Sequence, residues 1–147
     1  MEDTKNALTK EEIQTLIKKA YEMLDFAYTP YSRHKVGAAL LASDGTIYGG
    51  CNIENAAYTP TNCAERTAFF KAVSEGVRNF RAIAVVGGMD GVVTDYCTPC
   101  GVCRQVMREF CDPLTFLVIT AKSPEEYRVE TLEAVLPRGF GPENLMK

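Results

Sequence analysis

Apolar residues at helical spacing define the first element that the chain predicts. They recur every three or four positions, as expected of one face of an amphipathic helix. The repeat consists of Ile13, Leu16, Ile17, Ala20 and Leu24. Thr9 and Glu12 have the spacing of a capping box, and Pro30 cannot continue a helix. The pattern therefore predicts a packing helix that begins after Thr9 and ends before Pro30.

Two apolar segments on either side of an Asp-Gly pair predict a β-hairpin. Residues 36–42 and 46–52 flank Ser43-Asp44-Gly45. An Asp-Gly pair readily adopts the positive backbone angles of a tight turn, so these segments are expected to be antiparallel strands.

Helical and strand signals alternate along the rest of the chain. We expect a helix over 63–75 closed by Gly76, a strand over 82–86, a loop at Gly87-Gly88 and Asp90-Gly91, a helix over 101–110, a strand over 114–120 and a short helix over 129–136. Strand-helix-strand units normally pair their strands in parallel. Together with the hairpin they predict an α/β fold with a mixed sheet covered on both faces, in a single domain over residues 1–147.

Composition and charge exclude several classes of protein. The 147 residues are 46% hydrophobic and 24% charged, as in ordinary globular domains. The net charge of −3, without a basic cluster, argues against a polymeric nucleic acid partner. Residues 1–10 lack the apolar run of a signal peptide, and the apolar run at 36–42 is too short to span a membrane. We therefore expect a cytoplasmic protein that does not bind membranes.

Six cysteines in such a chain indicate metal ligands or buried thiols rather than disulfides. Cys63, Cys100 and Cys103 fall in the first turns of two predicted helices, where backbone amides and the helix dipole favour the thiolate. The short gap between Cys100 and Cys103 lets both sulfurs face one ion, and Cys63 arrives from the other helix. Three ligands leave open the fourth position that a catalytic zinc needs, so we predict one Zn²⁺ per chain.

Two charged residues next to Cys63 complete the predicted centre. Glu65 lies two positions beyond it and reaches the metal site without binding the ion only if Cys63 precedes the first regular turn. There it is expected to act as the catalytic acid and base. Zinc with three thiolates carries a net charge of −1, and Arg66 is placed to hydrogen-bond a thiolate, with Arg104 as a weaker candidate.

Two motifs carry a resemblance to a known family. The segments Thr61-Asn62-Cys63-Ala64-Glu65-Arg66 and Pro99-Cys100-Gly101-Val102-Cys103-Arg104-Gln105 resemble the zinc motifs of the small homotetrameric cytidine deaminases. The similarity extends from Tyr31-Ser32 to Leu136-Pro137 and covers most of the chain. It implies a three-layer α/β/α fold with a mixed five-stranded sheet, and a homotetramer with active sites shared between subunits.

The resemblance also implies a role for each matching residue. Cys63, Cys100 and Cys103 would hold zinc, Asn52 and Glu54 would bind the ribose hydroxyls, and Ala64 would contact the base through its backbone. Glu65 would protonate N3 of cytosine and then the departing amine, after water attacks C4. The expected reaction converts cytidine, or deoxycytidine with the same base, to the uracil nucleoside and ammonia in pyrimidine salvage. Phe140 would approach the substrate of a neighbouring subunit.

One position departs from the family pattern. Where the family places an aromatic residue that stacks on the pyrimidine, this chain has His34. Imidazole can stack, but it buries less apolar surface than a phenyl ring and titrates near neutral pH. We therefore expect His34 to weaken or alter nucleoside binding.

The sequence alone also allows other interpretations of the same residues. Cys97, Cys100 and Cys103 have iron–sulfur spacing, although Met107 occupies the position of a fourth cysteine. Cys100 and Cys103 have the spacing of a redox pair. Cys97 or His34 would turn the zinc into a structural one by completing its shell, as in a non-enzymatic binding module. Within the family, a modified cytosine nucleoside, such as an aminoacyl-nucleoside antibiotic, is the alternative substrate. Cys51, Cys97 and Cys111 are otherwise expected to be small buried side chains.

Overall fold

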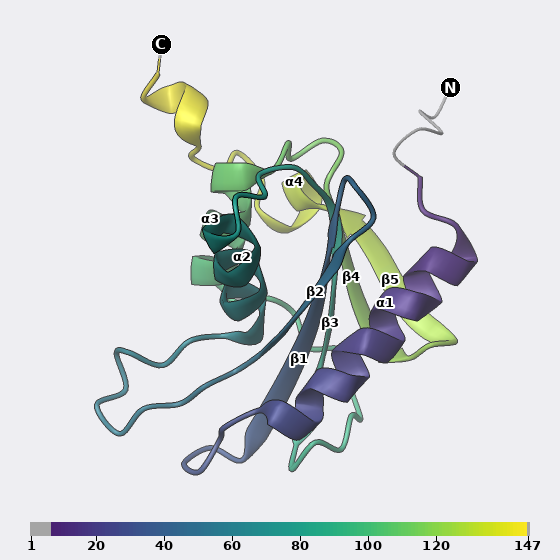
Figure 1. Cartoon of the computed structure of the whole chain (residues 1–147), viewed down its shortest axis with the longest axis vertical. Coiled ribbons are helices and arrows are strands. Elements are labelled where there is room, and N and C mark those ends of the chain that lie inside the picture. Colours follow the sequence, from purple (N-terminus) through teal and green to yellow (C-terminus); the bar gives the residue numbers. More distant parts are fainter. Residues whose placement is uncertain (1–6, 147) are drawn as a thin grey trace.

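A computed structural model describes residues 7–146 of the chain. Helices and strands alternate along it after an initial helix and hairpin (Figure 1). They are α1 (Lys10–Met23), β1 (His34–Ala42), β2 (Ile47–Cys51), α2 (Ala64–Ser74), β3 (Phe80–Met89), α3 (Gly101–Phe110), β4 (Leu117–Ser123), β5 (Glu126–Thr131) and α4 (Leu132–Val135), with short 3₁₀ turns at Leu24–Phe26 and Pro142–Asn144.

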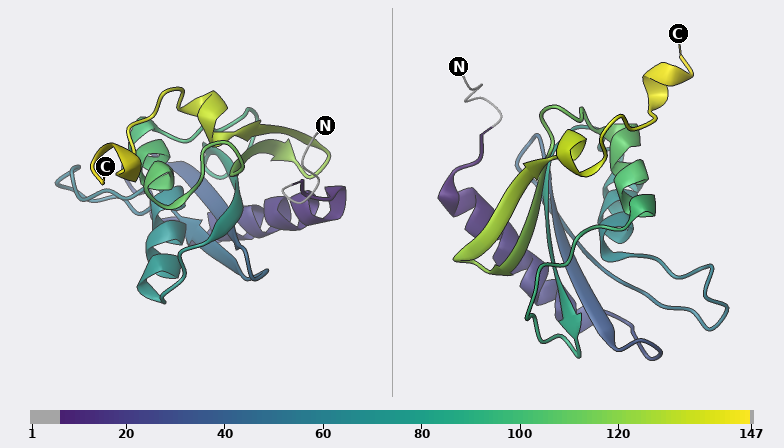
Figure 2. Two further views of the ribbon diagram at one scale, coloured as in Figure 1. Left: turned by 90° about the horizontal axis from the view of Figure 1, so that it is seen from above. Right: turned by 180° about the vertical axis from the view of Figure 1, so that it is seen from behind.

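The five strands form one mixed sheet in the order β2-β1-β3-β4-β5. β3 and β4 pair in parallel, and every other neighbouring pair is antiparallel. The helices flank the sheet on both sides, with α1 on one face and α2 and α3 on the other (Figure 2). The predicted three-layer α/β/α arrangement is confirmed.

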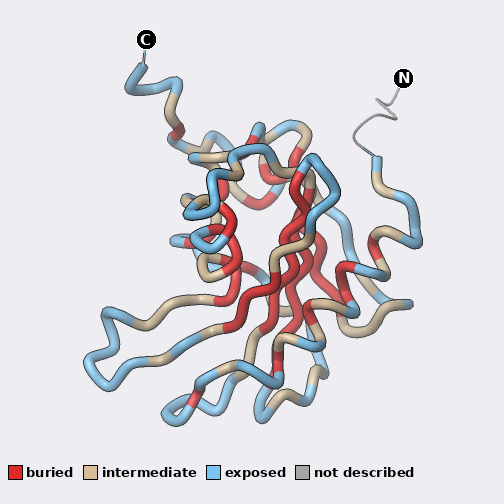
Figure 3. The backbone as a smooth tube through the Cα atoms, in the orientation of Figure 1, coloured by how far each residue is buried: buried red, intermediate tan, exposed pale blue. Residues whose placement is uncertain are grey.

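The interior strand β1 distributes its side chains between two cores, as the alternation of a strand requires. Ala39 and Leu41 face α1, whereas Ala38 and Leu40 face α2 and α3. The α1 side holds the helical repeat predicted from the sequence, and its first turn carries the predicted capping box. The strands β1 and β3 hold the longest continuously buried runs of the described chain (Figure 3).

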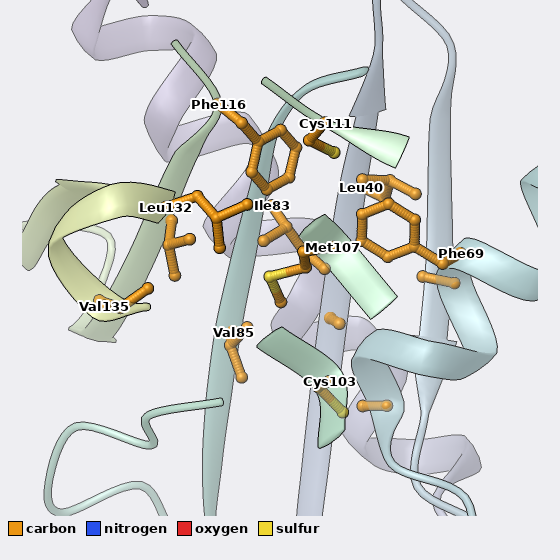
Figure 4. Packing of buried hydrophobic residues seen from close by; sticks show 14 of the residues in the cluster. Leu40, Phe69, Ile83, Val85, Cys103, Met107, Cys111, Phe116, Leu132 and Val135 are labelled. Carbon is orange, nitrogen blue, oxygen red and sulfur yellow. The ribbon is translucent and has the colours of Figure 1, made fainter. Parts of the chain in front are cut away.

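The second core joins α2, α3 and α4 to the sheet. Phe69 of α2, Met107 of α3 and Leu132 of α4 are all fully buried there (Figure 4). Cys103 lies at the edge of the same cluster and is 1% exposed. This packing fixes α2 and α3 beside each other, so that the orientations of their amino-terminal turns are set by the core.

The predicted elements differ from the observed ones in the second half of the chain. β3 continues through Gly87 and Gly88, which were predicted to lie in a loop. The strand predicted at 114–120 begins only at Leu117, because Asp112 binds the Leu114 and Phe116 amides in a turn.

The helix predicted over 129–136 is wrong in its first half. Residues up to Thr131 belong to the edge strand β5, and the helix spans only Leu132–Val135. β5 is largely exposed and carries alternate charged residues, so it lacks the apolar run by which a buried strand is recognised. Thr131 ends the strand and caps α4 by accepting the Ala134 amide.

Candidate metal centre and active site

The first turn of α2 brings Cys63 and Glu65 to the same place. Cys63 is the N-cap residue, with extended backbone angles (φ −76°, ψ 158°), and its carbonyl accepts the Thr67 amide to open the helix. The turn packs closely on β2. The closeness is such that a Cβ added at Gly50 would lie 2.3 Å from the Ala64 carbonyl oxygen. The condition that Cys63 precede the first regular turn is therefore met.

The first turn of α3 presents the other two cysteines. Cys100 is the N-cap residue (φ −68°, ψ 165°), and its sulfur accepts the Cys103 amide at 3.5 Å. Cys103 lies three residues further on, with its side chain buried in the core. Both sulfurs thus meet at the amino-terminal end of one helix, where the backbone amides favour thiolates.

The three sulfurs form a group that fits a zinc ion. The Sγ atoms of Cys63, Cys100 and Cys103 all lie within 4.8 Å of one another, and those of Cys63 and Cys100 are 3.7 Å apart. Two ligands bound about 2.3 Å from a tetrahedral zinc ion are separated by about 3.8 Å. Cys103 is buried, Cys63 is half-buried and Cys100 is exposed, so solvent can approach the group from the Cys100 side.

The charge of the three thiolates is offset by Arg66. Its Nη2 donates to the Cys63 sulfur at 3.2 Å. Hydrogen bonds from the Cys103 thiol and from Arg66 lower the pKa of Cys63 to about 5. Among the described residues, the buried Nε of Arg66 has no hydrogen-bond acceptor. A guanidinium with a free donor is well suited to lie beside an anionic group such as a thiolate cluster.

Glu65 is buried beside this group and retains a proton more readily than an ordinary glutamate. It is 4% exposed, and burial raises its pKa to about 7, with a smaller contribution from the nearby Cys63 thiolate. A carboxyl group that titrates near neutrality can both accept and donate a proton during a reaction. The structure therefore places a carboxyl group that titrates near neutrality beside the three cysteines, and its predicted catalytic role stays a prediction.

Arg104 does not have the role suggested for it from the sequence. Its guanidinium binds the carbonyl oxygens of Pro99 and Val135 rather than a thiolate. Its spacing from Cys103 placed it near the metal ligands, but the sequence could not show that backbone oxygens would take up its donors.

A second group of predicted residues lies around the start of β1. Asn52 accepts the Val36 amide at 2.9 Å and donates to the His34 carbonyl at 2.8 Å. Glu54 accepts the Tyr31 and Ser32 amides and the Ser32 hydroxyl. The residues predicted to bind the sugar therefore also fix the loop that leads into His34.

The loop before His34 is also fastened from its other side. Arg33 and Asp90 form a two-pronged ion pair, and both adopt positive φ angles of 62° and 55°. This pair could not be predicted from the sequence, because the two residues are 57 positions apart and neither belongs to a motif.

Phe140 lies near the carboxyl end of the chain. It follows α4 in a segment attached to α3, where Gln105 donates to its carbonyl at 2.9 Å. Phe140 is 56% exposed. Its assignment to a neighbouring subunit's active site stays a prediction.

The competing interpretations of the cysteines find no support in this arrangement. All six cysteines are free, and within residues 7–146 only Cys63, Cys100 and Cys103 form a metal-binding group. Neither Cys97 nor His34 belongs to it, so neither completes a structural zinc shell nor builds an iron–sulfur site. Burial raises the pKa of Cys97 to about 11, which keeps this thiol protonated. Cys51 and Cys111 are buried as expected.

Comparison with known proteins assigns this site to a family. Residues 10–119 match the model of the cytidine and deoxycytidylate deaminase zinc-binding region. The chain belongs to the cytidine and deoxycytidylate deaminase family. The three-cysteine group observed here lies within the matched region, so the predicted zinc cofactor is confirmed, and the assignment of these three cysteines as its ligands stays a prediction.

Relatives of this deaminase-family chain match it over nearly their whole length. It is 51% identical to a cytidine deaminase of Sporosarcina psychrophila over 91% of this chain and 95% of that protein. A cytidine deaminase of Halalkalibacterium halodurans is 48% identical over 90% and 96% of the two chains. The crystal structure of cytidine deaminase from Burkholderia pseudomallei superposes with a TM-score of 0.78 and 45% identity, covering 86% and 97% of the two chains. Among the described residues of this family member, no helix is both long and apolar enough to cross a bilayer.

Proposed function

We propose that this protein hydrolyses the 4-amino group of cytidine and deoxycytidine, releasing ammonia and the corresponding uracil nucleoside. The single observation that carries the proposal is the buried Glu65 beside three sulfurs spaced for zinc. Relatives sharing about half of the sequence are cytidine deaminases, which supports this substrate.

Cys63, Cys100 and Cys103 would hold the zinc ion, which would supply the Lewis acidity that makes water a nucleophile. Glu65 takes a proton from the attacking water and delivers it to N3 of cytosine as C4 becomes tetrahedral. It then transfers the second proton of that water to the amine, which leaves as ammonia while the carbonyl forms. Its pKa of about 7 suits both transfers. Arg66 offsets the negative charge of the thiolates throughout.

The groups around β1 have donors and acceptors left for the sugar. The Asn52 amide uses one of its two N–H donors on His34 and one acceptor lone pair on Val36, so one of each is left for a ribose hydroxyl. Glu54 accepts two backbone amides on Oε1 and the Ser32 hydroxyl on Oε2, so one lone pair is left on Oε2. Its side chain borders a pocket of about 170 Å³ with Ser32 and Tyr58. In this proposal His34 stacks on the base and the Ala64 backbone contacts its edge.

We further propose that the whole chain is one domain that assembles as a homotetramer in the cytoplasm. The exposed Phe140 and Tyr58 are then supplied with partners by neighbouring subunits. Six free thiols suit a reducing compartment. Light scattering should give a mass about four times the 16.2 kDa of one chain, and a monomer with full activity would contradict shared active sites.

The deaminase proposal is tested by mixing the purified zinc-loaded protein with cytidine, deoxycytidine or adenosine and following the ultraviolet spectrum. We expect the two cytosine nucleosides to convert to their uracil products and adenosine to remain unchanged. A zinc-loaded protein that converts neither cytosine nucleoside would refute the proposed function. Conversion of a modified cytosine nucleoside alone would support the alternative substrate instead.

A further inference from the structure

Arg104 holds both peptide groups that flank the zinc ligand Cys100. Its Nε donates to the carbonyl of Pro99, the peptide that precedes Cys100, at 2.7 Å. Its backbone amide donates to the carbonyl of Cys100 itself at 3.0 Å. One residue thus fixes the peptide planes on both sides of the Cys100 Cα, and these planes set the direction in which the sulfur points.

The guanidinium is anchored at its other end. Its Nη1 donates to the Val135 carbonyl at 2.6 Å, at the end of α4. Val135 and Leu132 of that helix are buried in the core between α3 and the sheet. A guanidinium is planar and rigid. The Pro99 carbonyl is therefore held in a fixed position relative to the Val135 carbonyl and the core.

Cys100 is the ligand that most needs such support. It is the exposed member of the three, whereas Cys103 is buried in the core. As the N-cap residue of α3 it has extended backbone angles, and of its backbone groups only the carbonyl takes part in the hydrogen bonding of the helix. Without Arg104, the Pro99–Cys100 peptide would lose its side-chain anchor to the core.

We propose that Arg104 is a positioning residue that pre-orients Cys100 for zinc and thereby sets the metal affinity of the centre. It differs from Arg66, which acts on the charge of a sulfur and not on the backbone that carries it. The inference rests on the zinc centre of the proposed function. It also makes zinc affinity depend on α4, an element that contributes no ligand to the metal.

The test compares zinc affinity in Arg104→Gln, Arg104→Lys and the parent protein, measured by competition with a chromophoric chelator. Loss of such a supporting contact is expected to weaken zinc binding about 10- to 100-fold. Lysine reaches one carbonyl but not both, so Arg104→Lys should fall between the parent and Arg104→Gln. Cobalt-loaded Arg104→Gln should show altered absorption of its tetrahedral thiolate site. With saturating zinc, the kcat and KM of that variant should return towards the parent values.

Arg78→Gln is the matched control, because Arg78 also donates to two backbone carbonyls, of Val73 and Val77, but at the far end of α2. It should leave zinc affinity unchanged. A purely structural role for Arg104 would lower the urea midpoint of its variants while their zinc affinity stayed within twofold of the parent, and that result would overturn the proposal. Should Arg104→Gln fail to fold, the zinc affinity of Arg104→Lys decides by the same twofold criterion. Zinc affinity is measured without substrate. The result for Arg104 therefore does not depend on whether the deaminase assay succeeds.

Discussion

The side-chain amide of Asn52 donates to the backbone carbonyl of His34 at 2.8 Å, while its oxygen accepts the Val36 amide. The Asn52 side chain therefore adds two hydrogen bonds between the end of β2 and the start of β1. Asn52, which is expected to contact the sugar, therefore also holds the backbone of His34, which is expected to face the base. If both expectations hold, substrate binding and loop geometry are coupled at this position.

Asn52→Asp tests this coupling. Aspartate can still accept the Val36 amide, but it cannot donate to the His34 carbonyl and would place two oxygens against each other. We expect the KM for cytidine to rise about tenfold or more, since an unmet hydrogen bond of this kind costs about 1–3 kcal/mol. Steady-state kinetics measures the effect. Asn79→Asp is the control, because Asn79 lies between α2 and β3 and contacts Ser43 through its backbone carbonyl, and an unchanged KM is expected there.

His34→Phe tests whether this position stacks on the base. A phenyl ring buries more apolar surface, and an aromatic pair contributes about 0.5–1.5 kcal/mol. The KM for cytidine should therefore fall about two- to tenfold, with kcat nearly unchanged. The same comparison with His34→Ala should show weaker binding than the parent. Equal KM values for all three proteins would remove His34 from the base pocket.

Glu65→Gln separates proton transfer from metal binding. Glutamine has nearly the shape of glutamate but cannot carry the proton, so turnover should fall by about 10²–10⁴-fold or more. Zinc content should stay at one ion per chain, because Glu65 is not one of the residues in the metal-binding group. Metal analysis and turnover are measured on the same sample. Undiminished turnover would show that another group moves the protons.

The metal centre could be predicted from the sequence because its geometry is local. Cys63 and Glu65 share one helix turn, as do Cys100 and Cys103, so spacing along the chain translates directly into spacing in space. The contacts of Arg104 and the Arg33–Asp90 pair could not be predicted in this way. Arg104 reaches Val135 31 positions away, and only the packing of α4 against α3 brings them together.

The same distinction explains which parts of the fold were predicted. The capping box of α1 and the hairpin around Gly45 depend only on residues close together in the chain, so both could be predicted from the sequence. The strand β5 depends on pairing with β4, and its own sequence of alternating charges is compatible with a helix. The expectation of five strands came from the family resemblance rather than from the pattern of this segment.

Glu12 should make stability depend on pH in the acid range. Its pKa is lowered, chiefly by the hydrogen bond from the Thr9 amide and further by Arg81. Because the folded protein prefers the carboxylate, this stabilisation is present above the unfolded pKa and is lost as pH falls through the lowered folded value. Glu12→Gln should be less stable than the parent at neutral pH, and the difference should disappear below pH ~3. Urea unfolding at several pH values measures it, with Glu11→Gln as the control. A constant difference at all pH values would contradict the argument.

Gly50 permits the close approach that puts the Cys63 turn in place, and Gly50→Ala should disturb it. The added Cβ would lie 2.3 Å from the Ala64 carbonyl oxygen and 2.6 Å from the Ala68 amide nitrogen, both backbone atoms that can move only with the helix. Such overpacking costs about 1–3 kcal/mol. Because α2 must shift away from β2, Cys63 moves relative to Cys100 and Cys103, and zinc affinity should fall together with the free energy of unfolding. Gly101→Ala adds the same methyl group to the first turn of α3, where it meets no atom within 4 Å. That control should bind zinc as tightly as the parent, whereas unaltered zinc binding in Gly50→Ala would show that the metal centre tolerates a displaced helix.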